Sequence, residues 1–329
     1  MPTLLSLHRI SKKYYHQSVL EDLSIQLEEG QIFGLSGESG SGKSTLLRIA
    51  AGLIDADGGE VWLDNQPLPL ASGQLIPGHP DIKIVHQDYN LSMPLTVREN
   101  INYALRYYEK AYRDERIEEL IQLCHLETVV DHPAKLLSGG EKQRTAIAQA
   151  LAEEARVLLL DEPFAHLDLP NRRRLTQTIR ELAEQMGVAC IFVTHDATDA
   201  LSLSHQMGVL RHGKLLQIGT PQSIYKQPVN AYVAELTGEV NFMGKGIFKQ
   251  LFGEITGQTI FEKEVMIRPE YFLIHKKPKA NSHKAKVVES IFEGSRYRVY
   301  FEIENRKLMA YHLNFLPKEQ IVFVSILGL

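Results

Sequence analysis

Four short, mostly apolar runs in the first two thirds of the chain predict buried strands. They occupy residues 31–36, 82–85, 157–160 and 188–193. Runs of this kind are typical of a parallel sheet, where both faces of each strand are covered by other elements. The run at residues 157–160 is entirely aliphatic and gives the strongest signal of the four.

Amphipathic helical patterns lie between these strands. In residues 115–124 four apolar residues share one helix face, namely Ile117, Leu120, Ile121 and Cys124. Residues 171–186 carry a similar stripe of Leu175, Ile179 and Leu182, which Gly187 closes. Because strands that alternate with helices build parallel sheets, we predict an α/β fold for residues 1–240, with a helical subdomain at about residues 88–155.

The pattern changes to strands alone from about residue 242. The predicted strands lie at residues 265–270, 285–292, 297–303 and 321–326. Apolar and polar residues alternate only partly in the third of them, where Tyr300 breaks the period of two. Glu304 and Asn305 supply a turn to the next strand. Residues 241–329 are therefore predicted to form a small all-β domain, a short antiparallel barrel of the oligonucleotide-binding (OB) type.

Composition narrows the class of protein. The chain has 329 residues, a formal net charge of −4 and an ordinary globular balance of 44% hydrophobic and 23% charged residues. That charge gives no general reason to expect a nucleic-acid binder. Two isolated cysteines, Cys124 and Cys190, indicate reduced core residues rather than a disulfide framework or a zinc site. No apolar run approaches the roughly 20 residues that span a bilayer.

A glycine-rich turn follows the first predicted strand and leads into a helical segment. It comprises Gly37, Glu38, Ser39, Gly40, Ser41, Gly42, Lys43, Ser44 and Thr45. Strand, loop and helix in this order are the context of a phosphate-binding loop, or P-loop. Its backbone N–H groups and the helix N-terminus would face phosphate oxygens. Lys43 would bridge the β- and γ-phosphates of a nucleotide, and the Ser44 hydroxyl would ligate Mg²⁺.

Charged side chains stand at the ends of two further strands. Asp161 and Glu162 follow the aliphatic run, and His195 ends the run at residues 188–193. In doubly wound sheets the carboxyl ends of the strands face the ligand. Phosphoryl transfer needs positioning, charge neutralisation and one base. Asp161 fits an outer-sphere carboxylate for Mg²⁺, and Glu162 fits the group that polarises the attacking water.

A second candidate anion site begins at Ser138, which can cap the helix that follows it. Gly139 and Gly140 would allow a phosphate to approach the backbone at that helix N-terminus, and Glu141 follows them. Within one chain this site is redundant with the P-loop. It has a purpose if it completes the nucleotide site of a second copy, so that the nucleotide lies between two subunits.

The order and spacing of these motifs resemble the ATP-binding cassette (ABC) family over roughly the first two thirds of the chain. The resemblance implies a P-loop NTPase cassette that binds ATP with Mg²⁺ and hydrolyses it. It implies that Gln87 ligates Mg²⁺ and the water, that His195 contacts the γ-phosphate, and that Asp168 belongs to a dimer-contact loop. Tyr14 or Tyr15 could stack on adenine, and the family spacing favours Tyr14. His86, Ala165 and His166 depart from the usual residues.

The last third resembles importer ATPases of the maltose, polyamine and ferric-iron type, whose regulatory domain is a TOBE-like barrel. This implies a transporter subunit that couples ATP-driven dimer closure to solute transport, with import favoured. The implied partners are a second ATPase subunit in a homodimer, polytopic permease subunits and an extracytoplasmic substrate-binding protein. The implied location is the cytoplasm, on the inner face of the cell membrane.

The alternative is a soluble cassette ATPase that acts on nucleic acid or the ribosome. Members of that kind carry a coiled-coil interruption, zinc cysteines or a second cassette, and this chain shows none of these features.

Overall fold

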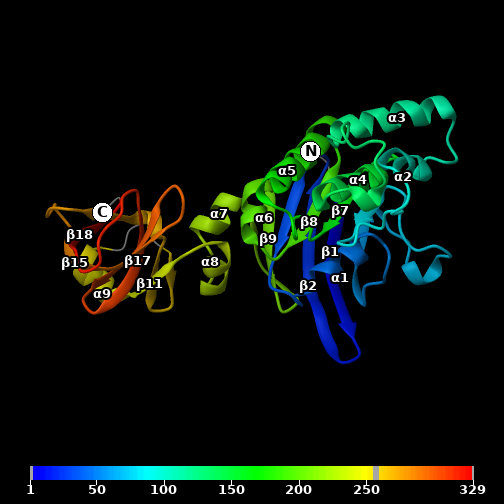
Figure 1. The fold of residues 1–329 in the computed structure, drawn as a ribbon. Helices are drawn as coiled ribbons and strands as arrows, with labels where there is room; N and C mark the ends of the chain where they lie inside the picture. The colour runs from blue at the N-terminus through cyan, green and yellow to red at the C-terminus, as the bar shows by residue number, and fades with distance from the viewer. Residues whose placement is uncertain (1–2, 255–258, 328–329) are drawn as a thin grey trace. The chain divides into compact units, whose positions relative to one another are not determined.

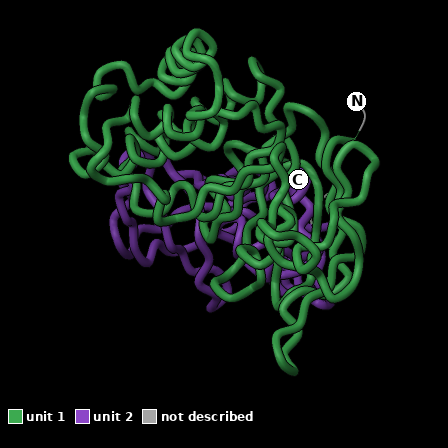
Figure 2. Tube along the Cα trace, turned by 90° about the vertical axis from the view of Figure 1, so that its right-hand side faces the viewer, with its two compact units in different colours: residues 1–222 green, residues 223–329 purple. Residues whose placement is uncertain are grey.

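The computed structural model describes residues 3–254 and 259–327 of the chain. The chain divides into two compact units, residues 1–222 and residues 223–329 (Figure 2). The second unit takes in helix α8 (Ala231–Thr237) together with the strands that follow it. The domain boundary after residue 240 stays a prediction.

The first unit is built on a six-stranded sheet. Five strands run parallel, and the edge strand β10 pairs antiparallel with β9 (Figure 1). Every residue of β3 and β8 is buried. The predicted parallel α/β core is therefore confirmed. In spatial order the strands are β10 (Lys214–Gly219), β9 (Gln206–Arg211), β3 (Ile32–Ser36), β8 (Ala189–Thr194), β7 (Val157–Asp161) and β6 (Ile82–Val85).

The parallel register brings the carboxyl ends of four strands to one edge of this sheet. Ser36 of β3 pairs with Thr194 of β8, and Asp161 of β7 pairs with Val193 of β8. On the other side of β7, Leu160 pairs with Val85, the last residue of β6. The segments that follow these strands consequently leave the sheet side by side, which is where doubly wound sheets bind their ligands.

A second, antiparallel sheet packs onto the same core. Helix α1 (Lys43–Ala50) contributes Leu46 and Leu47 to a buried cluster that also contains Leu5 of the antiparallel sheet and Leu35 of β3. The helix that begins at the P-loop is thus fixed by apolar contacts with both sheets. In spatial order the antiparallel strands are β2 (Gln17–Glu28), β1 (Thr3–Tyr14), β4 (Gly58–Leu63) and β5 (Gln66–Pro67).

Two of the helices of this unit carry the apolar stripes predicted for them. Helix α3 (Lys110–Leu123) buries Ile117, Leu120 and Ile121, and helix α5 (Leu169–Met186) buries Leu175, Ile179 and Leu182. Gly187 ends α5 with a left-handed φ of 67°, and its N–H donates to the Leu182 carbonyl. Among the described residues, the other helices of this unit besides α1 are α2 (Val97–Ala104), α4 (Gly139–Leu151) and α6 (Ala197–Leu203). Helix α7 (Pro221–Lys226) spans the boundary between the units at residue 222. Among the residues described, no helix combines the length and the apolar character that crossing a membrane requires.

The second unit is a small antiparallel β structure, consistent with the predicted OB-like barrel. A three-stranded sheet and a five-stranded sheet share one apolar core. The first has the order β11 (Asn241–Gly244), β13 (Glu264–Ile267) and β12 (Ile260–Phe261). The second has the order β14 (Phe272–His275), β18 (Ile321–Ile326), β15 (His283–Phe292), β16 (Tyr297–Ile303) and β17 (Arg306–His312).

Two details of this unit differ from the sequence-based expectation. Helix α9 (Lys245–Phe252) interrupts the region predicted as strands alone, because Phe248, Leu251 and Phe252 fill the barrel core from one helix face. Tyr300 does not break the alternation of β16. It is only partly buried, and the Lys307 ammonium of β17 lies 4.3 Å from its ring centroid.

Candidate functional site

The P-loop spans residues 37–42, between the end of β3 and the start of α1. Two of its positions require glycine. A Cβ on Gly37 would lie 2.2 Å from the Leu210 carbonyl oxygen, and Gly42, the N-cap of α1, has a left-handed φ of 105°. Larger residues would push the loop away from β9 or strain the start of the helix. The sequence thus forms a tight loop whose backbone closes around the Lys43 side chain.

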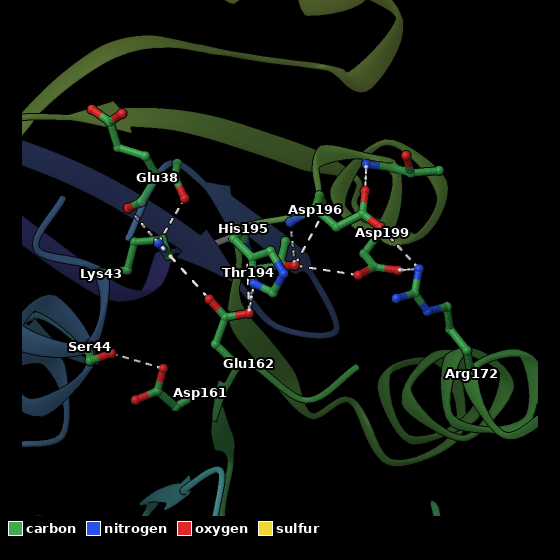
Figure 3. Close-up of polar contacts among 12 residues, drawn as sticks. Glu38, Lys43, Ser44, Asp161, Glu162, Arg172, Thr194, His195, Asp196 and Asp199 are labelled. Atoms are coloured by element: carbon green, nitrogen blue, oxygen red, sulfur yellow. Dashed lines mark hydrogen bonds and ion pairs between the residues drawn. The ribbon is translucent and has the colours of Figure 1, made fainter. Parts of the chain in front are cut away.

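The Lys43 ammonium is held inside this loop. Its Nζ donates to the Gly37 carbonyl at 2.8 Å and to the Glu38 carbonyl at 3.0 Å (Figure 3). A Glu162 carboxylate oxygen lies 4.0 Å away. Burial lowers the pKa of Lys43, and the carboxylates of Glu162, Asp161 and Glu38 oppose that shift. The lysine is therefore a desolvated cation at the floor of the loop, placed to meet anionic oxygens.

Side-chain oxygens from three segments, α1, β7 and the residues after β6, lie near Lys43. The Ser44 hydroxyl, at the start of α1, donates to Asp161 Oδ1 at 3.0 Å (Figure 3). Gln87, just after β6, lines the same cavity. Hydroxyl, amide and carboxylate oxygens are the ligands that Mg²⁺ accepts alongside phosphate oxygens and water. The donor set present here fits that ion.

Glu162 and His195 face each other across the ends of β7 and β8. The His195 Nδ1 atom lies 2.8 Å from Glu162 Oε2, and the His195 backbone N–H points at the same oxygen at 3.3 Å (Figure 3). Glu162 has a φ of 50°, in the left-handed region that non-glycine residues seldom adopt. Backbone strain of this kind is typical of functional sites. In this arrangement the two side chains form one hydrogen-bonded unit at the sheet edge.

A charged cluster beside His195 was missed by the sequence analysis. Arg172 Nη1, from α5, lies 3.1 Å from Asp196 Oδ2 and 3.2 Å from Asp199 Oδ1 (Figure 3). The Thr194 hydroxyl donates to Asp199 Oδ2 at 3.3 Å. Burial raises the pKa of Asp199 to about 6, although the nearby Arg172 charge lowers it. Two acidic residues three positions apart, directly after a strand-end histidine, were the signal that could have revealed this cluster.

These groups surround a cavity of ≈ 650 Å³ at the sheet edge. Its walls include most of the predicted nucleotide-binding residues and also several that were not predicted. The predicted lining residues are Tyr14, Ser39, Gly40, Gly42, Lys43, Ser44, Thr45, Gln87, Glu162 and His195. The unpredicted ones are Val19, Phe164, Ala165, His166, Arg172, Thr194, Asp196 and Asp199. Gly37, Glu38, Ser41 and Asp161 belong to the surrounding segments, and among the described residues they are not part of the cavity wall.

The segment from Ser138 to Glu141 lies apart from this cavity. Ser138 caps α4: its hydroxyl accepts the Glu141 N–H at 3.4 Å, and Glu141 Oε2 accepts the Ser138 N–H at 2.8 Å. Burial opposes ionisation of Glu141, but the hydrogen bonds from Ser138 together with the charges of Arg144 and His132 lower the pKa of the carboxyl. Among the described residues that line the cavity, none comes from the segment from Ser138 to Glu141. In the single chain the surface at this helix N-terminus is thus separate from the cavity, and its predicted role as an anion site stays a prediction.

Gly140 and Asp168 connect that surface to α5. A Cβ on Gly140 would lie 2.7 Å from the Asn171 side chain, so α4 and α5 approach closely there. Asp168 is the N-cap of α5, and its carboxylate accepts the Asn171 N–H at 3.0 Å. The predicted dimer-contact loop therefore ends on the same helical turn that contacts Gly140.

Comparisons with known proteins match both units. Residues 20–165 match the family model described as ABC transporter, and residues 265–320 match the TOBE domain. A solved structure of cbiO1 from Clostridium perfringens, described as part of the ABC transporter complex cbiONQ, is 24% identical with a TM-score of 0.63. The alignment covers 68% of this chain and 91% of that one.

Two further solved structures are similar to this chain. The ATP-binding cassette MJ0796, in a dimeric post-hydrolysis state bound to ADP and Pi, is 29% identical with a TM-score of 0.58 over 66% of this chain and 99% of that one. The ADP conformation of MJ1267, an ATP-binding cassette of an ABC transporter, is 22% identical with a TM-score of 0.60. That alignment covers 73% of this chain and 100% of MJ1267.

Proposed function

We propose that this chain, which joins an ABC transporter domain to a TOBE domain, is the ATP-hydrolysing subunit of a membrane transporter. The observation that carries the proposal is the convergence of four strand ends on one cavity. Lys43, Glu162 and His195 reach it from three of these ends. Their chemistry is that of phosphoryl transfer, which needs a cation at the phosphates and a base for the water.

ATP would bind with its phosphates in the P-loop and its base toward Tyr14. The loop amides and the start of α1 supply N–H donors, and Lys43 supplies the charge. Tyr14 ends β1 on the cavity wall and is 42% exposed, with the Lys12 ammonium 5.6 Å from its ring centroid, and its ring would be accessible for stacking. Ser44, Gln87 and Asp161 would hold Mg²⁺. When bound, that ion neutralises charge on the phosphates.

Glu162 would act as the base that polarises the attacking water, with His195 beside it. Glu162 is only 18% exposed and sits between the Lys43 cation and the His195 ring. The hydrogen bond to His195 restricts the carboxylate to one orientation. The imidazole, which is 61% exposed, would also reach the γ-phosphate at the cavity mouth. Both roles depend on the sheet edge that holds β7 and β8 in register.

The separate surface at Ser138 supports a shared-site dimer. It offers a capped helix N-terminus and two glycines, but it lies outside the cavity of its own chain. In a dimer of two such chains it would close over the ATP of the partner. The P-loop, Glu162, His195 and the Ser138 segment all occur in this chain, so a homodimer provides two complete sites.

The TOBE match favours an importer. The chain would then work with permease subunits on the inner face of the membrane and with an extracytoplasmic substrate-binding protein. The segment after Gln87 would carry dimer closure to the permease. Hydrolysis would then reopen the dimer and reset the transporter.

Substitution of Glu162 tests this proposal directly. Glu162→Gln should retain ATP binding and lose about 10²- to 10⁴-fold in the rate of hydrolysis, because the amide cannot act as a base. Steady-state phosphate release measures the rate, and the exposed Glu184→Gln on α5 is a matched control. Robust turnover by Glu162→Gln would refute the assigned base.

The ATP-bound Glu162→Gln variant can also capture partners from solubilised membranes. Recovery of a polytopic membrane subunit supports a transporter, whereas recovery of ribosomes or nucleic acid alone refutes the transporter function.

A further inference from the structure

The loop that carries His195 is held mainly by its polar neighbours. The imidazole is 61% exposed, so packing does not fix it, and its position follows from its contact with Glu162 and from the backbone at residues 194–196. That backbone is tied by hydrogen bonds to side chains. The Asp196 N–H donates to the Thr194 hydroxyl at 3.1 Å, and the Thr198 N–H donates to Asp196 Oδ1 at 2.9 Å.

Arg172 joins this loop to a different helix. Its guanidinium approaches Asp196 at 3.1 Å and Asp199 at 3.2 Å, so one side chain of α5 binds both carboxylates of the α6 start (Figure 3). The Asp199 side chain is 5% exposed, so its charge has little access to water and depends on the arginine. Asp199 in turn accepts from the Thr194 hydroxyl, the residue next to His195.

The α5 end of this contact is itself firmly placed. Arg172 lies in the first turn of α5, and its backbone N–H donates to the carbonyl of the N-cap residue Asp168 at 2.9 Å. Asn171, in the same turn, packs against Gly140 at the start of α4. Arg172 is therefore fixed on a helical turn that is anchored on both sides and can impose its position on the His195 loop.

We propose that Arg172 is a positioning residue that holds the His195 loop against Glu162 through its contacts with Asp196 and Asp199. The proposal rests on the proposed ATPase function and adds a residue to it. Arg172 lines the cavity, but its guanidinium pairs with Asp196 and Asp199, so in this proposal it acts through His195 rather than on ATP. Its removal should therefore lower kcat and leave the KM for ATP nearly unchanged, because the P-loop contacts stay intact.

Hydrogen–deuterium exchange tests the positioning without any nucleotide. In Arg172→Gln, the amides of His195, Asp196 and Thr198 should exchange at least about tenfold faster than in the wild type, because their acceptors lose a fixed position. The β8 amides should keep their rates. Arg173→Gln, an exposed neighbour on the same helix, is the matched control and should exchange like the wild type. Unchanged exchange at residues 195–198 in Arg172→Gln would overturn the proposal.

The rate of ATP hydrolysis tests whether the position of the His195 loop matters for catalysis. Arg172→Gln should lower kcat by about 10- to 100-fold, as expected for a misplaced catalytic group, with KM within about twofold of wild type. Arg172→Lys should recover part of kcat, because it restores the charge. In a His195→Ala background, adding Arg172→Gln should change kcat by less than about twofold.

The two measurements separate the possible failures. Equal losses in kcat with and without His195, or a raised KM with an unchanged kcat, would overturn the positioning role. A wild-type protein without ATPase activity would refute the proposed function, while the exchange rates would still decide whether Arg172 holds the loop.

Discussion

At the scale of single residues, the cavity contains ionisable groups whose burial disfavours the charged form of the side chain. Burial lowers the pKa of Lys43 and raises the pKa of Asp199. In both cases nearby opposite charges only partly offset the effect. Such groups are more typical of binding and catalytic sites than of a surface selected for stability. They also make the stability of the protein depend on pH.

Asp199 gives a pH dependence with a defined sign. Because its pKa in the folded protein, about 6, lies above that of an ordinary aspartate, folding takes up a proton there. The stability from this proton is present at low pH and is lost as the pH rises through 6. Arg172, Asp196, Thr194 and Glu162 are the groups that act on this carboxyl.

The test compares wild type with Asp199→Asn, which does not titrate. The unfolding free energy of the wild type, relative to that of Asp199→Asn, should fall by about 1–1.5 kcal/mol between pH 5 and pH 8. Urea unfolding at both pH values measures it. A difference that stays constant, or one that grows with pH, would contradict the raised pKa.

At the scale of elements, regular patterns in the sequence predicted the central strands of the parallel sheet and several of the later strands, but not the antiparallel sheet of β1, β2, β4 and β5. The aliphatic run before Asp161 and the stripe of α5 needed only local periodicity, and both were predicted correctly. Arg172 and Arg268 could not be placed in this way, because their partners are distant in sequence. Arg268 lay within the strand predicted at residues 265–270, but β13 ends at Ile267 and the Arg268 side chain is fully buried. Helix α9 was missed because it is short, although the spacing of Phe248, Leu251 and Phe252 was a usable signal.

Arg268 is the clearest tertiary anchor within the second unit. It follows β13, and its Nη1 atom donates to the carbonyls of Ala234 at 2.9 Å and Gly238 at 2.9 Å, at the end of α8. Its Nη2 atom donates to the Thr237 hydroxyl and to the Tyr225 carbonyl, both at 3.0 Å. The guanidinium thus binds the last turn of α8 to the start of the barrel.

Removal of this anchor should weaken the second unit. Arg268→Ala leaves several buried carbonyls without a donor and creates a cavity, so we expect it to lower the unfolding free energy of that unit by about 3–5 kcal/mol. Chemical unfolding, followed by exchange of the amides of residues 231–252 and 260–326, measures the loss. Arg306→Ala, on an exposed part of β17, is the control. If both variants unfold at the same denaturant concentration, Arg268 is not an anchor.

At the scale of the whole molecule, the proposed function depends on a second copy of the chain. Each chain carries the groups proposed for hydrolysis in or beside its cavity, and the proposed anion surface at Ser138 lies outside that cavity. The sequence already indicated two such surfaces, since both are helix N-termini with glycines. It could not show that they are apart within one chain, because that depends on the placement of α4 and α5 relative to the sheet.

Sedimentation of Glu162→Gln, with and without Mg²⁺-ATP, measures its mass in solution and tests the shared-site dimer most directly. We expect a monomer without ATP and a dimer with one ATP bound per chain. Adding Ser138→Arg should keep nucleotide binding and abolish the dimer, because the new side chain would fill the surface meant for the partner's phosphate. A protein that binds ATP fully and stays monomeric, or an ATP-dependent dimer that Ser138→Arg leaves intact, would contradict the shared-site model.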